Sequence, residues 1–305
     1  MAYIPTSELM ARARRAGTVI PAYNIPYLPM VAPVVQAIKD CNSVGLVMVA
    51  RLEWEKFESR SLEAVRDEYE TCKLPGHTRL HLDHVPVIDE DDLRVDFKAI
   101  IARAIAAGYE SVMVDGSRLS LAENIACTRE IVEFAHAAKI PVEGELGAVM
   151  GHEAGPLPPY EELFASGKGF TDPEEARRFV TETGVDWLSV AIGNIHGAIS
   201  AATKGQQKVA ARLSIPQLER IHAATGIPLV LHGGTGIRKE YILQSLQHGM
   251  AKINVATAIR QPYERTLEKG VSAAQTAVYE AMRTVIRDDL DVQNSAAVLK
   301  PQEKT

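Results

Sequence analysis

The chain has 305 residues, of which 46% are hydrophobic, and a formal net charge of −6. This length suits one large α/β domain, and the absence of Lys/Arg runs interleaved with aromatic residues argues against nucleic-acid binding. No apolar segment has the length of a membrane span and no apolar leader opens the chain, so we expect a cytoplasmic protein without a membrane partner.

The three cysteines, Cys41, Cys72 and Cys127, have no CxxC spacing. A disulfide framework or a cysteine zinc site is therefore not expected, and the thiols are predicted to be reduced.

A short amphipathic helix is predicted at Thr6–Ala16, and eight apolar runs then alternate with segments of helical periodicity. The runs are Thr18–Ile25, Val44–Ala50, Thr78–His84, Ser111–Ser117, Pro141–Gly147, Trp187–Gly193, Ile227–Gly234 and Ala251–Thr257. The helical segments include Phe97–Ala107, Leu121–Ala138, Pro173–Thr183, Ile215–Ala224, Lys239–Gln247 and Ala273–Ile286. Near-continuous apolar runs are typical of parallel strands that helices cover on both faces.

Eight β–α units predict an α/β fold of the (β/α)8 TIM-barrel type, as a single domain over residues 1–305 with a helical extension at about 260–290 and a polar tail. A doubly wound sheet is the lesser alternative, because no glycine-rich loop follows the first run. Two segments, Met150–Gly169 and Ala198–Leu213, are too long for ordinary connections, and we interpret them as loops over a site.

Three histidines follow the ends of separate runs, at His84, His196 and His232. Because the C-terminal ends of barrel strands meet at one face, these imidazoles predict a catalytic Zn²⁺ with an open position. Asp83 lies next to a ligand and is placed for proton transfer. His81 is expected on the opposite face of the strand from His84, because successive side chains of a strand alternate between its faces. We interpret it as a structural residue or as one that orients the metal ligands.

Other strand ends carry glycine or carboxylates. The loop Gly233–Gly236 leads into a helix and, with Asn254–Thr257, predicts a phosphate cradle. Asp115 and Glu145 either support the ligands, hold a metal in an alternative position, or pair with a barrel Arg or Lys. A Schiff-base role for Lys252 is the weaker idea, because Lys252 is expected at the start of its strand and the histidines would stay unexplained.

Nine motifs in order along residues 22–260 resemble the class II, zinc-dependent ketose-bisphosphate aldolases, which include the fructose- and tagatose-bisphosphate aldolases. The motifs are AYNI, HLDH, GYESVMVDGS, ENIACTREIVEFAH, VEGELG, TDPEEA, VAIGNIHG, IPLVLHGGTGI and KINVAT. The resemblance implies a sugar-phosphate substrate, one Zn²⁺ per subunit, a monovalent cation (Na⁺ or K⁺) near the phosphate, and a homodimer or homotetramer.

The resemblance also implies roles for single residues. His84, His196 and His232 look like the zinc ligands, Asp83 like the acid/base for the C4 hydroxyl, and Glu153 like the residue that moves a proton on the hydroxymethyl carbon. Asp115 and Glu145 match residues near the alternative metal position. Contacts to the dihydroxyacetone phosphate half are implied for Asn24, Gly197, Gly233, Gly234, Thr235, Asn254, Val255, Ala256, Thr257 and Arg260.

The chain departs from the family pattern on the aldehyde side. Met48 and Ala50 stand near the end of strand two, where Gln and Ser are usual, and Ala154 stands where Asp is common. We therefore expect an aldehyde that differs from glyceraldehyde 3-phosphate.

Two other readings compete with an aldolase. A zinc hydrolase would have an HxH pair on the first strand, which here ends in Asn24. A non-catalytic barrel that binds a sugar phosphate would have lost its ligands, but the predicted ligands, Asp83 and Glu153 are all present.

Overall fold

The computed structural model describes residues 3–147, 160–194 and 211–300, and in these ranges eight parallel strands form a closed barrel in chain order. The strands are β1 (Ile20–Asn24), β2 (Gly45–Ala50), β3 (Thr78–Asp83), β4 (Ser111–Val114), β5 (Val142–Leu146), β6 (Trp187–Val190), β7 (Leu229–Leu231) and β8 (Met250–Val255). β1 pairs in parallel with both β2 and β8, so the sheet has no edge. The (β/α)8 prediction is confirmed, and the doubly wound alternative, an open sheet, is excluded.

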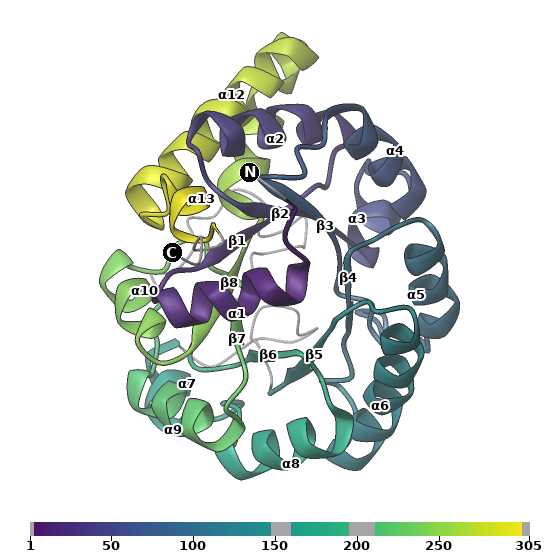
Figure 1. Cartoon of the computed structure of the whole chain (residues 1–305), viewed down its shortest axis with the longest axis vertical. Coiled ribbons are helices and arrows are strands. Elements are labelled where there is room, and N and C mark those ends of the chain that lie inside the picture. The colour runs from purple at the N-terminus through teal and green to yellow at the C-terminus, as the bar shows by residue number, and fades with distance from the viewer. Residues whose placement is uncertain (1–2, 148–159, 195–210, 301–305) are drawn as a thin grey trace, which may run out of the picture.

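Helices surround the barrel (Figure 1). They are α1 (Thr6–Ala16), α2 (Val31–Asp40), α3 (Arg51–Lys56), α4 (Leu62–Cys72), α5 (Phe97–Ala106), α6 (Leu121–Ala137), α7 (Tyr160–Ser166), α8 (Pro173–Thr183), α9 (Ile215–Thr225), α10 (Lys239–Leu246), α11 (Thr257–Thr266), α12 (Val271–Thr284) and α13 (Ser295–Val298), with short helical turns η1 (Leu28–Met30), η2 (Leu267–Lys269) and η3 (Val285–Asp289). Within the described ranges, no helix combines the length and apolarity needed to cross a membrane.

The core has two parts. The larger part lies between the strands and the surrounding helices, where both faces of each strand are buried. The smaller part lies at the end where the strands begin, and there Leu9 and Met10 of α1 pack with Ile20, Leu46 and Trp187. α1 therefore closes the N-terminal end of the barrel, and the C-terminal ends of the strands are left to build a site.

The segment Met150–Gly169 was expected to be a loop, but its second half contains α7. Tyr160 explains this placement, because its hydroxyl donates to the carbonyl oxygens of Gly193 and Arg212 at 3.1 Å each. These bonds hold α7 against the end of the β6 connection. The first part of the predicted loop lies outside the described residues.

The segment after α12 is docked against the start of β2. Ser295 is 2% exposed, and its hydroxyl lies 3.1 Å from Ser43 Oγ and accepts from the Val44 amide at 3.1 Å. Leu299 is fully buried in the smaller core. Contacts that include a buried serine and an apolar side chain thus anchor the polar tail as far as residue 299.

Replacing Ser295 by alanine should lower the free energy of unfolding by about 1–3 kcal/mol, because the buried Val44 amide loses its acceptor. Urea unfolding followed by circular dichroism would measure the change. Ser272→Ala, at an exposed position of α12, is the matched control and should change stability by less than about 0.5 kcal/mol. Equal effects of the two substitutions would contradict the docking role of Ser295.

Candidate active site

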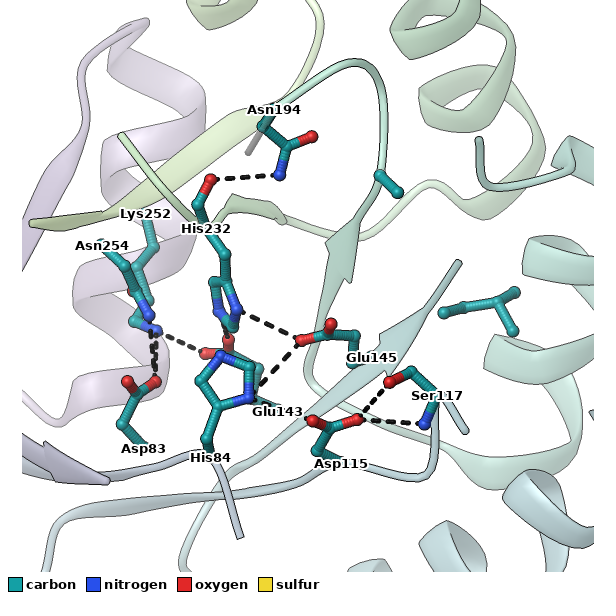
Figure 2. Close-up of polar contacts among 12 residues, drawn as sticks. Asp83, His84, Asp115, Ser117, Glu143, Glu145, Asn194, His232, Lys252 and Asn254 are labelled. Atoms are coloured by element: carbon teal, nitrogen blue, oxygen red, sulfur yellow. Dashed lines mark hydrogen bonds and ion pairs between the residues drawn. The ribbon is translucent and has the colours of Figure 1, made fainter. Parts of the chain in front are cut away.

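Asp83 lies at the centre of the C-terminal end of the barrel, where it is 1% exposed (Figure 2). The side-chain amide of Asn24, from β1, donates to Oδ2 of Asp83 at 3.0 Å, and that of Asn254, from β8, donates to Oδ1 at 3.0 Å. Burial opposes ionisation, but the positive charges of His84 and Lys252 outweigh it and lower the pKa of Asp83 to about 2. Asp83 is therefore ionised at neutral pH, and the two amides hold its carboxylate in one orientation.

Two of the predicted ligands, His84 and His232, meet beside Asp83. Their ring centroids are 4.5 Å apart, and one donor atom from each of Asp83, His84 and His232 lies within 4.8 Å of the others. His84, Asp115 and Glu145 form a second group of this kind. Imidazole nitrogens and carboxylate oxygens are the donors that Zn²⁺ uses in catalytic sites, so these residues fit the predicted metal.

The charges around His84 also favour a cation. Burial opposes its protonation, but Asp83, Glu145 and Asp115 outweigh burial and raise the pKa of His84 to about 10. The Nδ1 atom of His84 lies 3.1 Å from Asp115 Oδ2, and Asp115 is itself held by the hydroxyl of Ser117 at 2.6 Å. A divalent cation would supply the positive charge that this group of carboxylates stabilises.

Glu143, on β5, lies behind His232 and is fully buried. Its Oε1 lies 2.9 Å from Nε2 of His232, and its Oε2 accepts from the indole of Trp187 at 2.7 Å and from Lys252 at 2.8 Å. A carboxylate on one ring nitrogen orients an imidazole and directs the other nitrogen elsewhere. For His232 that other nitrogen, Nδ1, lies 3.2 Å from Glu145, on the side of the candidate metal site.

Glu145 is among the predicted site residues, whereas Glu143 has no predicted role. The signal was present, because Glu143 and Glu145 are two residues apart on one strand and so face the same side of the sheet. The partners of Glu143 come from β6, β8 and the segment after β7, and the sequence does not show that these elements meet at Glu143. Asn194 is a second such residue, and its amide donates to the carbonyl of His232 at 3.0 Å.

Lys252 is not at the start of its strand as expected, but inside β8 and in the barrel interior, with no exposed surface. Its Nζ atom donates to Glu143 at 2.8 Å and lies 4.0 Å from Asp83 Oδ1. The ammonium group of Lys252 thus interacts with the carboxylates of both Glu143 and Asp83. His81 is in the same layer, where Ser111 Oγ lies 2.8 Å from its Nδ1 and burial lowers its pKa to about 3.

The predicted phosphate loop follows β7 and faces the N-terminal end of α11. Thr235 Oγ1 accepts from the amide of Ala258 at 3.3 Å, which ties the loop to the first turn of α11. The amide of Gly234 donates to the Asn254 carbonyl at 3.0 Å, and a Cβ atom on Gly234 would lie 2.3 Å from Ile253 Cγ2. Gly234 is thus required for close packing, and a phosphate would depend on the other amides of Gly233–Gly236 and of Val255–Thr257 at the end of β8.

Arg260 pairs with a carboxylate of its own helix. Its Nη1 atom lies 2.8 Å from each carboxylate oxygen of Glu264, and the guanidinium lies 5.4 Å from the centre of the Phe57 ring. A role of Arg260 in phosphate binding stays a prediction. His196, Gly197 and Glu153 lie outside the described residues.

A closed (β/α)8 barrel whose strand ends bring together Asp83, His84 and His232 has the architecture of a barrel enzyme with a candidate metal site. A family model described as class-II fructose-bisphosphate aldolase matches residues 4–298. A protein of Staphylococcus epidermidis named fructose-bisphosphate aldolase is 30% identical over 303 residues, which cover 99% of this chain and 92% of the relative.

Solved structures show the same fold. The YdjI aldolase of Escherichia coli has a TM-score of 0.74 at 24% identity, covering 97% of this chain and 100% of that one. A fructose-bisphosphate aldolase of Campylobacter jejuni has a TM-score of 0.70 at 18% identity, covering 96% of each chain. The chain therefore belongs to the class II fructose-bisphosphate aldolase family and is an aldolase-type lyase.

Glu53, on α3, is a buried acid beside this site that the sequence pattern does not single out. It is 6% exposed, and its Oε2 accepts from the Ala50 amide at 2.8 Å. Burial raises its pKa to about 8, and the negative charge of Asp83 adds to this effect. At neutral pH Glu53 is therefore mostly protonated, and it places no full negative charge next to Asp83.

This raised pKa predicts a pH-dependent stability. The unfolded carboxyl titrates near 4.5 and the folded one near 8, so the folded state binds the proton more tightly. The resulting stabilisation is complete below the unfolded pKa and is lost as the pH rises through the folded pKa. Relative to Glu53→Gln, the native chain should lose on the order of 1–4 kcal/mol between about pH 4.5 and about pH 8.

Urea unfolding of the two proteins across this pH range would measure the difference. Glu55→Gln, at an exposed position of the same helix, is the control, and its difference from the native chain should stay constant with pH. A constant difference for Glu53→Gln as well would rule out the raised pKa.

Proposed function

We propose that this aldolase cleaves a ketose phosphate, a 1,6-bisphosphate or a related sugar phosphate, into dihydroxyacetone phosphate and an aldehyde, and that it uses one Zn²⁺ per subunit. The observation that carries the proposal is the position of Asp83, ionised, fixed by two asparagine amides, and within 4.8 Å of donor atoms of His84 and His232. Membership of the family supports the aldol reaction and a zinc ion as its cofactor.

In the cleavage direction, Asp83 accepts the proton of the C4 hydroxyl while the bond between C3 and C4 breaks and C4 becomes the aldehyde carbonyl. The electron pair of that bond stays on the C3 side, and a proton added to C3 then completes dihydroxyacetone phosphate. Zn²⁺ bound by His84, His232 and His196 would act as a Lewis acid that stabilises the developing negative charge. The expected donor of the C3 proton, Glu153, stays a prediction.

The remaining residues would position the substrate. Asn24 and Asn254 hold Asp83 in place, and the Oδ1 atom of Asn254 is buried without a hydrogen-bond partner among the described residues, as an acceptor for a substrate hydroxyl would be. The phosphate would bind where Gly233–Gly236 meets the first turn of α11, because a helix N-terminus favours an anion. A monovalent cation at the phosphate, a homodimer or homotetramer, and a cytoplasmic location also stay predictions.

The proposal is tested by the release of dihydroxyacetone phosphate from fructose 1,6-bisphosphate, tagatose 1,6-bisphosphate and their 1-phosphates, with and without a chelator. Zinc-loaded protein should cleave at least one of these sugars, and removal of the metal should abolish cleavage. Asp83→Asn should retain zinc but lower kcat at least about 100-fold, because it removes the proton acceptor. Cleavage of none of these sugars by the zinc-loaded protein would contradict the proposal, and failure to bind zinc as well would favour the non-catalytic barrel.

The contact between Glu143 and His232 predicts a change in metal affinity. Glu143→Gln should weaken zinc binding by roughly 10–100-fold, because the imidazole loses the charged partner that orients it. Competition with a chromogenic chelator would measure this affinity without relying on turnover.

Two further variants control the experiment. Trp187→Phe removes another donor to Glu143 and leaves the bond to His232, so zinc affinity should change by less than about threefold. Glu143→Gln combined with Lys252→Met removes both charges of the buried pair, and it tests the same contact if the single variant unfolds. Native zinc affinity in this double variant would exclude the positioning role of Glu143.

A further inference from the structure

A small cavity of about 70 Å³ adjoins the candidate active site at His84 and Asp115. It lies over the ends of β2, β3 and β4, whereas the predicted phosphate loop follows β7 and faces the start of α11. In the closed barrel, the cavity and the predicted phosphate loop therefore lie on different sides of Asp83. If one side takes the dihydroxyacetone phosphate half, as in the proposed function, the cavity is placed to take the other half.

Part of the cavity wall is apolar. Ala50 contributes from the end of β2 and Leu52 from the first turn of α3, and Pro86 and Ile88 contribute from the segment after β3. These side chains have no hydrogen-bond donor, and proline also lacks a backbone N–H. These side chains cannot provide the charged donors with which proteins bind phosphate.

Three backbone amides near the cavity are also engaged. The amide of Arg51 donates to the His84 carbonyl at 3.2 Å, that of Val87 to the Asp115 carbonyl at 2.9 Å, and that of Asp89 to the Leu93 carbonyl at 2.9 Å. A phosphate could use any of these three amides only by breaking the bond that the amide already makes.

The charged part of the wall is mainly acidic. Asp89, Glu90 and Asp115 line the cavity together with the imidazole of His84 and a single guanidinium, that of Arg118, among the described residues. The Nδ1 atom of His84 lies 3.1 Å from Asp115 Oδ2, so the imidazole is already partnered by a carboxylate. Nη1 of Arg118 donates to the Asp89 carbonyl at 2.6 Å and to Asp92 Oδ1 at 2.9 Å, so this cation is already partnered.

Arg51, which lies beside the cavity, is partnered in the same way. It pairs with Asp89 at 3.3 Å and with Glu55 at 3.9 Å. A phosphate dianion in the cavity would therefore face carboxylates whose neighbouring cations are in use. A neutral polyhydroxylated chain, in contrast, could donate its hydroxyl hydrogens to these carboxylates.

We propose that the cavity receives the aldehyde half of the substrate and that this half carries no phosphate, so that the preferred substrates are ketose 1-phosphates. The inference rests on the proposed aldolase function and goes beyond it in substrate class. The bond that breaks is still that between C3 and C4, and the product beside dihydroxyacetone phosphate is an uncharged hydroxyaldehyde.

The test compares kcat/KM for fructose 1-phosphate and tagatose 1-phosphate with that for the corresponding 1,6-bisphosphates, with dihydroxyacetone phosphate as the measured product. The zinc-loaded full chain should prefer the monophosphate of at least one pair by about tenfold or more. Equal or better use of the bisphosphates would overturn the inference and leave the aldolase function standing. Release of dihydroxyacetone phosphate from none of the four sugars would overturn both.

A charge reversal in the cavity tests the assignment of the site. Glu90 is partly exposed and lies on the cavity wall, so Glu90→Lys should shift the ratio of kcat/KM values toward the bisphosphate by about fivefold or more. Glu133→Lys, at an exposed position of α6, makes the same change in net charge and should leave the ratio unchanged. An unchanged ratio in Glu90→Lys would show that the end of the substrate does not enter this cavity.

Discussion

The buried ion pair between Glu143 and Lys252 is the interaction on which the centre of this barrel depends. Glu143 has no contact with solvent and binds three side chains, from β6, β8 and the segment after β7. An unpaired charge at this depth would be strongly destabilising, so each partner requires the other. The pair fixes the orientation of His232 above it and places a positive charge 4.0 Å from Asp83.

The site has two layers of side chains. The lower layer lies inside the barrel, and the upper layer lies at the C-terminal ends of the strands. The lower layer contains Glu143, Lys252 and His81 and is closed to solvent. The upper layer contains Asp83, His84 and His232, which have the donor atoms for a metal and a carboxylate for proton transfer. Since the lower layer holds the upper one in place, residues that contact no substrate can still decide how well a metal binds.

The two sides of the site differ in the charge that they favour in a ligand. Toward α11, the glycine loop and a helix N-terminus favour an anion. Toward the ends of β2, β3 and β4, carboxylates and engaged arginines surround a small cavity. This asymmetry gives a physical basis for a substrate that is phosphorylated at one end only.

The sequence by itself determined the barrel and most of the strand ends, because buried parallel strands need continuous apolar runs and barrel chemistry needs polar residues directly after them. It placed Asp83, His84 and His232 at strand ends and identified the family. It missed α7, because a short helix held by the hydroxyl of Tyr160 has no strong periodicity of its own. Only the tertiary structure decided that Glu143 lies under His232, that Arg260 pairs with Glu264, and that the amide of Gly234 is already bonded. These outcomes depend on which strands become neighbours when the barrel closes, and a pattern along one strand fixes the face of a residue but not its partner across the barrel.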